Sequence, residues 1–133
     1  NASSQNSVTL FQLWIHSQTQ DVTPRYEQKK IESLLTNNAF TTIVKPKQEA
    51  LQDDIWIHQQ AYVCIGDFSD DTHTNYTIQQ SQNGAYVMVV EGSVVIADQT
   101  LQHRDAIGIW NTTSINMSIA KNSRILIVEV PMI

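Results

Sequence analysis

The side chains that could carry acid–base or metal chemistry are few in this chain, and their spacing matches no familiar site. The histidines, His16, His58, His73 and His103, form no H-x-H, H-x3-H or H-E-x-x-H pattern, which are spacings that bring imidazoles together on a metal. We expect His16 and His58 to bond loop backbone at strand ends, and His73 and His103 to lie in solvated turns. The histidines therefore give little support to a metal centre.

Two carboxylates and one thiol remain as candidates for proton transfer or nucleophilic attack. Glu91 and Glu129 lie within apolar runs, where a carboxylate could act as a general acid or base if a partner were positioned beside it. The sequence identifies no such partner. Cys64 is flanked by apolar residues, and thiols in such surroundings behave as small, unreactive hydrophobic groups. We therefore predict no catalytic residue.

Short β-rich runs at regular spacing dominate the chain from residue 40 onward and predict an all-β domain. We expect turns at Asn83-Gly84, Glu91-Gly92 and Asp98-Gln99 to join four strands into a meander. The nearly continuous apolar runs 94–96 and 125–128 indicate strands covered on both faces, as in an antiparallel, two-sheet jelly roll. The predicted strands are 40–44, 55–58, 61–68, 74–80, 85–91, 93–97, 106–111, 114–120 and 124–130.

The first forty residues carry different signals. Residues 8–16 alternate in a way that predicts a strand. Thr23 followed by Pro24 predicts the start of a helix, which we expect to continue through apolar residues spaced near 3.6 and to end by Asn37. The expected fold is thus a β-sandwich with one short N-terminal helix. Residues 1–7 are expected to be a disordered tail or a cloning remnant, and residues 8–133 one domain.

Length, charge and composition argue against some classes of binding partner. A chain of 133 residues with a formal net charge of -5 makes one domain and disfavours binding to nucleic acid. Residues 1–7 lack the basic and apolar regions of a leader peptide, and no apolar run is long enough to span a membrane. The single cysteine, Cys64, is compatible with a reducing compartment. We expect a cytoplasmic protein without a nucleic-acid or membrane partner.

Several separated stretches resemble one known family. They are residues 12–15 (QLWI), 24–30 (PRYEQKK), 58–61 (HQQA), 84–92 (GAYVMVVEG) and 128–131 (VEVP). Together they are similar to the C-terminal half of pirin-like proteins, two-cupin proteins of which some bacterial members are described as quercetin 2,3-dioxygenases. The resemblance implies a cupin jelly roll. It also implies that the single metal ion of the family is held by the other, N-terminal cupin. A divalent transition metal such as Fe, Ni, Cu or Zn is expected in this chain only if the chain is itself a dioxygenase.

The cupin metal pattern, when placed on this chain, finds no ligands. If Gly92 occupies the glycine of the pattern, Ala85 stands where the glutamate should be. If Arg104-Asp105 replaces the Gly-Asp of the second part of the pattern, Ile115 stands where the last histidine should be. The paired histidines are replaced by Gln79 and Ser81, or in the alternative register by Ile78 and Gln80. The resemblance therefore implies a degenerate site, with no metal and no cofactor in this domain.

An apolar stretch near the N-terminus suggests a protein partner. In two-cupin relatives the corresponding segment follows the first cupin, so Leu10, Phe11, Leu13 and Trp14 would be exposed without it. An apolar patch of this kind on a monomer indicates an interface. We expect either a homo-oligomer or docking onto a metal-bearing N-terminal cupin domain.

Three functions remain open from the sequence. The first is a non-catalytic structural and interaction half of a pirin-like protein. The second is a small-molecule-binding barrel for a small planar ligand, lined by inward positions that include Gln79, Ser81, Val87, Ile115 and Met117. The third is a metal-dependent flavonoid dioxygenase with unusual ligands such as His58, His73 or His103.

Overall fold

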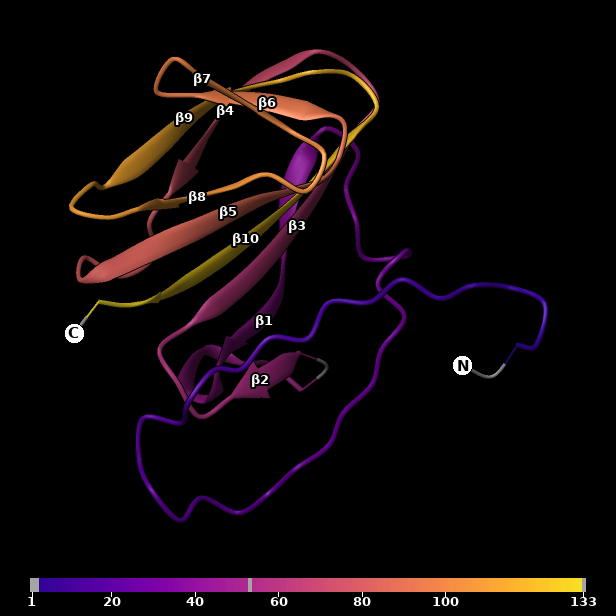
Figure 1. Ribbon diagram of the computed structural model, residues 1–133. Helices are drawn as coiled ribbons and strands as arrows, with labels where there is room; N and C mark the ends of the chain where they lie inside the picture. The colour runs from indigo at the N-terminus through magenta and orange to yellow at the C-terminus, as the bar shows by residue number, and fades with distance from the viewer. Residues whose placement is uncertain (1–2, 53, 133) are drawn as a thin grey trace.

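The computed structural model describes residues 3–52 and 54–132, and in that part of the chain ten strands form two sheets (Figure 1). The larger sheet has the order β2-β1-β3-β10-β5-β8 and the smaller one β4-β9-β6-β7. Neighbouring strands are antiparallel except for the parallel pair β1 and β2. The strands are β1 (Ala39–Pro46), β2 (Ile55–Ile57), β3 (Tyr62–Phe68), β4 (Thr72–Thr77), β5 (Asn83–Glu91), β6 (Ser93–Ile96), β7 (Gln99–Gln102), β8 (Ala106–Ile109), β9 (Ser114–Ile119) and β10 (Ser123–Pro131).

The core lies between the two sheets and follows from the alternation of side chains along each strand. On β10, Ile125 and Ile127 point into the core, whereas Leu126 and Val128 belong to a second cluster on the outer face of the larger sheet. The larger sheet is therefore apolar on both faces, which explains the continuous apolar run that β10 shows in the sequence. The all-β, two-sheet prediction is confirmed.

The predicted N-terminal helix is wrong. Residues 24–35 form no helix, and the one helical turn in the described part of the chain is a short 3-10 helix at Lys47–Glu49. The apolar side chains that were expected to make a helical stripe bury little surface, since Tyr26 is 84% exposed and Leu34 is 50% exposed. A short helix gains its stability mainly from packing an apolar face, and here no such face is packed.

The predicted meander is also wrong, although its strands exist. β4 and β6 lie in the smaller sheet while β5 lies in the larger one, so the chain crosses between the sheets at both connections. Asn83 and Gly84 begin β5 instead of forming a turn. The turn near Asp98 does close a hairpin, with Ala97 and Asp98 both at positive φ, but it leads into β7, a four-residue strand that was not predicted.

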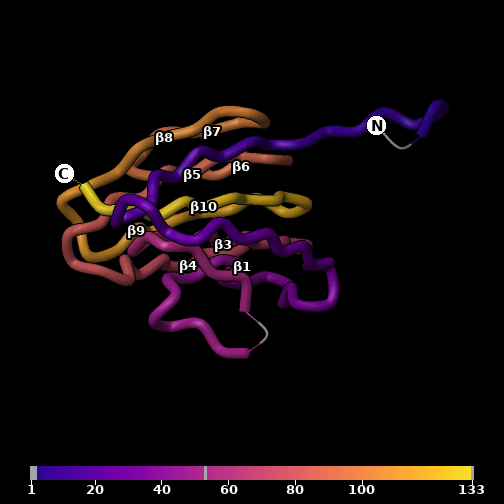
Figure 2. The backbone as a smooth tube through the Cα atoms, turned by 90° about the horizontal axis from the view of Figure 1, so that it is seen from below, coloured from indigo at the N-terminus to yellow at the C-terminus, as the bar shows by residue number. Residues whose placement is uncertain are grey.

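The segment before β1 makes a long excursion beside the sandwich (Figures 1 and 2). Residues 8–16, expected as a strand, have no partner strand. The excursion rejoins the body where the backbone N–H of Asn38 donates to the carbonyl of Asp67, over 2.7 Å. Of the expected tail, residues 1–2 lie outside the described residues, and Ser3 Oγ accepts backbone hydrogen bonds from Gln5 and Asn6.

No helix within residues 3–52 and 54–132 has the length and apolar character needed to cross a membrane.

Candidate functional site

The positions predicted for cupin metal ligands do not make a metal centre. Gln79 and Ser81 are exposed in the loop that follows β4, while Ala85 and Ile115 are buried in the core. Within the described residues, no group of three or more His, Cys, Asp or Glu side chains lies close enough to hold a metal ion. The side chains present therefore do not fit the single metal ion of the cupin pattern.

The four histidines do not come together at one site. The His58 ring contacts the Trp56 ring edge-on, with the centroids 5.0 Å apart. His73 Nδ1 lies 2.9 Å from Ser118 Oγ, across the β4–β9 pair, and His103 Nδ1 lies 2.7 Å from the carbonyl oxygen of Val90. His16 lines a surface pocket, and its segment is bonded to that of His58, because the Gln18 N–H donates to the His58 carbonyl and the Gln59 side chain donates to the His16 carbonyl. In the part of the chain that the structure describes, the histidines thus do not gather into a metal-binding group.

The five residues proposed to line a barrel cavity divide into two groups. Val87, Ile115 and Met117 are buried and pack in the core cluster, where they contact apolar side chains of both sheets. Gln79 and Ser81 lie outside that cluster and are exposed. This division does not test the binding of a small planar ligand, which stays a prediction.

The densest polar cluster surrounds Glu129, which is fully buried near the end of β10. Its carboxylate accepts hydrogen bonds from Tyr76 Oη and Asn83 Nδ2, both over 2.8 Å. The backbone N–H groups of Gln79 and Gln80 donate to the same carboxylate over 3.0 and 3.1 Å. Four donor groups thus converge on one buried carboxylate.

The strand pattern explains why Glu129 points inward. It continues the inward alternation of Ile125 and Ile127 on β10, and its donors lie on β4, at the start of β5 and in the loop between them. A buried charge is tolerated only when hydrogen bonds replace its hydration. Because the carboxylate is sealed from solvent and saturated with donors, this cluster fastens the β4–β5 loop to the larger sheet and leaves no position for a substrate.

A thiol and two phenols extend this network. Tyr76 Oη lies 3.7 Å from Cys64 Sγ, which in turn lies 3.3 Å from Thr42 Oγ1. Burial raises the pKa of the Cys64 thiol and of the Tyr76 phenol, so neither group is activated as a nucleophile. Burial also raises the pKa of Tyr62, which donates to Glu49, to about 12.

These shifts predict a measurable resistance to alkaline ionisation. The pKa of Tyr62 is about 12 in the folded chain against a usual 10.0, so folding favours the protonated phenol. This contribution to stability is complete below about pH 10 and is lost as the pH rises toward 12. In an ultraviolet titration near pH 11, roughly midway, the folded chain should show fewer tyrosinates than the urea-unfolded chain. Tyr62→Phe should reduce this difference in tyrosinate number, whereas Tyr86→Phe, at an exposed position, should not. Equal tyrosine ionisation in the folded and unfolded chains would contradict the prediction.

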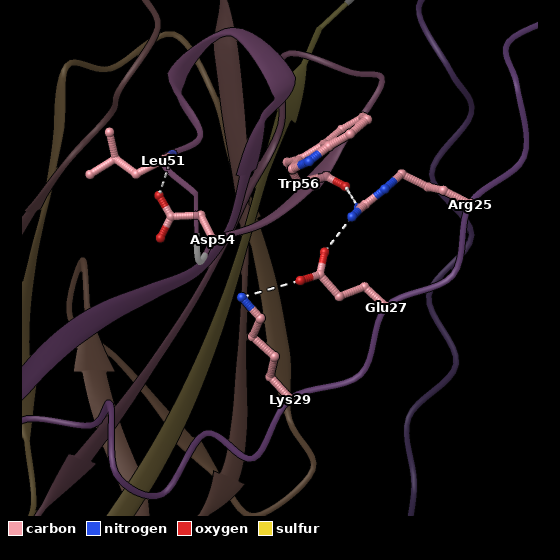
Figure 3. Close-up of polar contacts among 6 residues, drawn as sticks. All are labelled: Arg25, Glu27, Lys29, Leu51, Asp54 and Trp56. Atoms are coloured by element: carbon pink, nitrogen blue, oxygen red, sulfur yellow. Dashed lines mark hydrogen bonds and ion pairs between the residues drawn. The ribbon is translucent and has the colours of Figure 1, made fainter.

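The N-terminal segment is held against β2 by contacts of Arg25 with Trp56, which the sequence did not predict (Figure 3). The Arg25 guanidinium stacks over the Trp56 ring at 3.9 Å and donates to the Trp56 carbonyl over 2.6 Å. Arg25 and Lys29 both pair with Glu27 and hold the pKa of its carboxyl group below the usual range. This arrangement takes the place of the predicted helix over these residues.

The predicted interface residues project from the excursion upstream of this anchor. Trp14 is 83% exposed and Leu10 is 69% exposed, and both Phe11 and Leu13 are 47% exposed. We call residues 8–14 the apolar segment. The next residue, Ile15, by contrast packs against the outer cluster of the larger sheet. The apolar segment therefore exposes large apolar side chains directly before Ile15, which packs against the sheet.

Comparison with protein families places this arrangement among known domains. Residues 43–130 match the family described as the quercetinase C-terminal cupin domain. A quercetin 2,3-dioxygenase of Escherichia coli (strain K12) is 24% identical over 131 residues, which are 98% of this chain and 54% of that protein. The chain thus spans about half the length of this curated relative.

Solved structures show the same fold. The structure described as bacterial pirin YhhW in complex with nickel(II), from Escherichia coli, aligns with a TM-score of 0.76 at 21% identity, covering 90% of this chain and 49% of that one. A quercetin 2,3-dioxygenase from Acinetobacter baumannii aligns with a TM-score of 0.58 at 16% identity, covering 69% of this chain and 30% of that one. The predicted cupin fold and the resemblance in sequence are both confirmed.

Proposed function

Because the chain belongs to the family of quercetinase C-terminal cupin domains, we propose that it is a non-catalytic half that docks onto a metal-bearing cupin domain. That domain is either a separate chain or another part of a longer parent chain. When it is missing, the same surface associates with a second copy of this chain. The observation that carries the proposal is the closed core, in which Ala85 and Ile115 stand where the cupin pattern has its glutamate and its last histidine, while Gln79 and Ser81, at the paired-histidine positions, lie exposed outside that core.

The closed core supports a structural role in two ways. Val87 is fully buried, and Ile115 and Met117 pack beside it in one apolar cluster. The one carboxylate that points inward from β10, Glu129, has its hydrogen-bonding capacity filled by Tyr76, Asn83 and backbone N–H groups. A dioxygenase of the cupin type needs open coordination positions at its metal, and neither arrangement offers donors for one.

The surface supports the docking role. The apolar segment is continuous through Ile15 with the outer cluster of the larger sheet, where Met88, Val90 and Val130 are only partly buried. Apolar surface of this kind marks sites of protein association. The chain spans about half the length of its relative, and in this proposal the domain that covers the apolar face corresponds to the remaining half. The cytoplasmic location remains a prediction.

The proposal predicts the metal content and native mass of the purified chain. We expect less than stoichiometric Fe, Ni, Cu and Zn by elemental analysis, and a light-scattering mass above that of the 15.1 kDa monomer. The double variant Leu10→Ser/Trp14→Ser should shift the mass toward the monomer, because it removes two large exposed apolar groups from the apolar segment. The matched control is Leu51→Ser/Trp110→Ser, which removes two exposed side chains of the same kinds elsewhere and should leave the mass unchanged.

Two results would overturn the proposal. One is a stoichiometric transition metal in the purified chain. The other is oxygen consumption with quercetin by this chain alone after metal addition, which would favour the dioxygenase instead.

A further inference from the structure

A surface pocket of about 480 Å³ lies where the N-terminal excursion meets the end of the sandwich. This volume falls within the roughly 300–1,000 Å³ typical of small-molecule sites. Among the described residues, its lining consists of five glutamines, Asn83, two serines, His16 and Pro131, with no Asp, Glu, Lys or Arg. The pocket is therefore rich in hydrogen-bonding groups and poor in charge, although the chain as a whole carries a net charge of -5.

One wall of the pocket is the N-terminal excursion, which is tied to the turn between β2 and β3. The backbone N–H of Gln18 donates to the carbonyl of His58 over 2.7 Å. The Gln59 side chain donates to the carbonyl of His16 over 3.0 Å and accepts from the Gln60 N–H over 2.8 Å. The Gln18 and Gln59 donors run in opposite directions between the two segments, and the Gln60 N–H orients the Gln59 amide within the turn. Together these bonds fix the wall in place.

The opposite wall is held by the buried carboxylate. Asn83 Nδ2 donates both to Glu129, over 2.8 Å, and to the Gln60 carbonyl, over 3.2 Å. Gln80 is fixed through its backbone N–H by Glu129 and through its side-chain amide by Tyr62 Oη, at 3.0 Å. A pocket whose walls are already ordered loses little entropy when a ligand binds.

Several polar groups in this pocket have no protein partner. In the described part of the chain, no side-chain hydrogen bond is made by Gln18, Ser81 or Gln82, and the Oε1 atom of Gln80 accepts none. Carboxamides and hydroxyls offer donors and acceptors together. The free groups of the pocket can therefore bond ligand groups that are themselves both donors and acceptors.

We infer that this pocket binds a neutral polyhydroxylated ligand of the sugar or polyol class. Ligand hydroxyls match the mixed donors and acceptors of the lining. A charged ligand would lose hydration without meeting an opposite charge among the described lining residues. A planar aromatic ligand would find no Phe, Tyr or Trp for stacking among those same residues. The inference goes beyond the docking role, because it requires neither a metal nor a partner domain.

The test uses the full chain, labelled with nitrogen-15, and observes its side-chain amides by NMR. The probes are glucose, sucrose and myo-inositol, with inorganic phosphate and quercetin as contrasting ligands. We expect at least one neutral probe to cause saturable shifts in the amide signals of Gln18 and Gln82. The variant Gln18→Leu/Gln82→Leu should bind about tenfold or more weakly, since it removes hydrogen bonds at two exposed positions. Gln99→Leu/Gln102→Leu, at two exposed positions on β7, is the matched control and should bind as the native chain does.

Three outcomes would overturn the inference. These are the absence of saturable shifts with all three neutral probes, unchanged binding by the Gln18→Leu/Gln82→Leu variant with its backbone spectrum intact, and preferential binding of phosphate or quercetin at these residues. Failure of the docking role has a different signature, a metal-loaded chain or quercetin turnover, so the two proposals can fail independently.

Discussion

Replacing Glu129 by alanine should lower the free energy of unfolding by about 3–5 kcal/mol. The substitution leaves the Tyr76 hydroxyl, the Asn83 amide and two backbone N–H groups without their shared acceptor. Each is a polar group at or near the core, and a buried donor without a partner loses the hydration that it had in the unfolded chain. Loss of the side-chain volume adds a cavity cost.

Two matched variants separate this explanation from a general effect of losing a carboxylate. Glu91→Ala removes a glutamate that is exposed at the end of β5 and should change stability by less than about 0.5 kcal/mol. Glu129→Gln keeps the volume but presents an NH₂ group to donors, so it should fall between the native chain and Glu129→Ala. Urea denaturation monitored by circular dichroism gives all three values. The interpretation would be wrong if Glu129→Ala were as stable as Glu91→Ala.

The same cluster shows why its partners could not be predicted from the sequence. Glu129 lies 50 residues from Gln79 and 46 from Asn83 along the chain. Hydrophobic alternation could place the side chain of Glu129 within an apolar run, but only the order of strands in the two sheets determines which loop reaches it. Arg25 and Trp56, 31 residues apart, form a second pair that local patterns do not reveal.

The strands other than β7, in contrast, could be predicted because their signal is local. Alternation within β9 and the apolar run of β10 reflect burial on one or both faces, and each strand carries its own pattern. The spacing of apolar residues around Ile31 and Leu34 resembles a helical stripe just as closely, yet no surface is available to pack it. Periodicity thus predicts which face an element would bury, whereas the fold decides whether anything covers that face.

The candidate site illustrates the same limit. The sequence alone could assign Gln79, Ser81 and Ala85 to cupin ligand positions by their spacing from Gly92, and Ile115 by its spacing from Arg104-Asp105. The amide-lined pocket could not be predicted, because its lining comes from residues 16–18, 59–60, 80–83 and 131. Those segments meet only when the N-terminal excursion folds back on the β2–β3 turn.

Gly92 occupies the connection at which the chain passes from β5 in the larger sheet to β6 in the smaller one. Its φ of +77° lies in the left-handed region, which costs a residue with a Cβ about 1–2 kcal/mol. A Cβ at this position would lie 2.1 Å from Ser123 Oγ and 2.8 Å from Ser123 Cα. Ser123 cannot easily yield, because its hydroxyl bridges the backbone N–H and carbonyl of Ser93, at 3.0 and 3.2 Å.

Gly92→Ala should therefore lower the free energy of unfolding by about 2–5 kcal/mol, from backbone strain and overpacking together. Gly108→Ala is the matched control, since the nearest atom to its Cβ would be 3.9 Å away, and its effect should stay within about 1 kcal/mol. Adding Ser123→Ala to Gly92→Ala removes the closest clash but leaves the strained φ, so the double variant should recover part of the loss. Equal urea midpoints for Gly92→Ala and Gly108→Ala would show that this turn relaxes freely and that the crossing between the sheets does not depend on glycine.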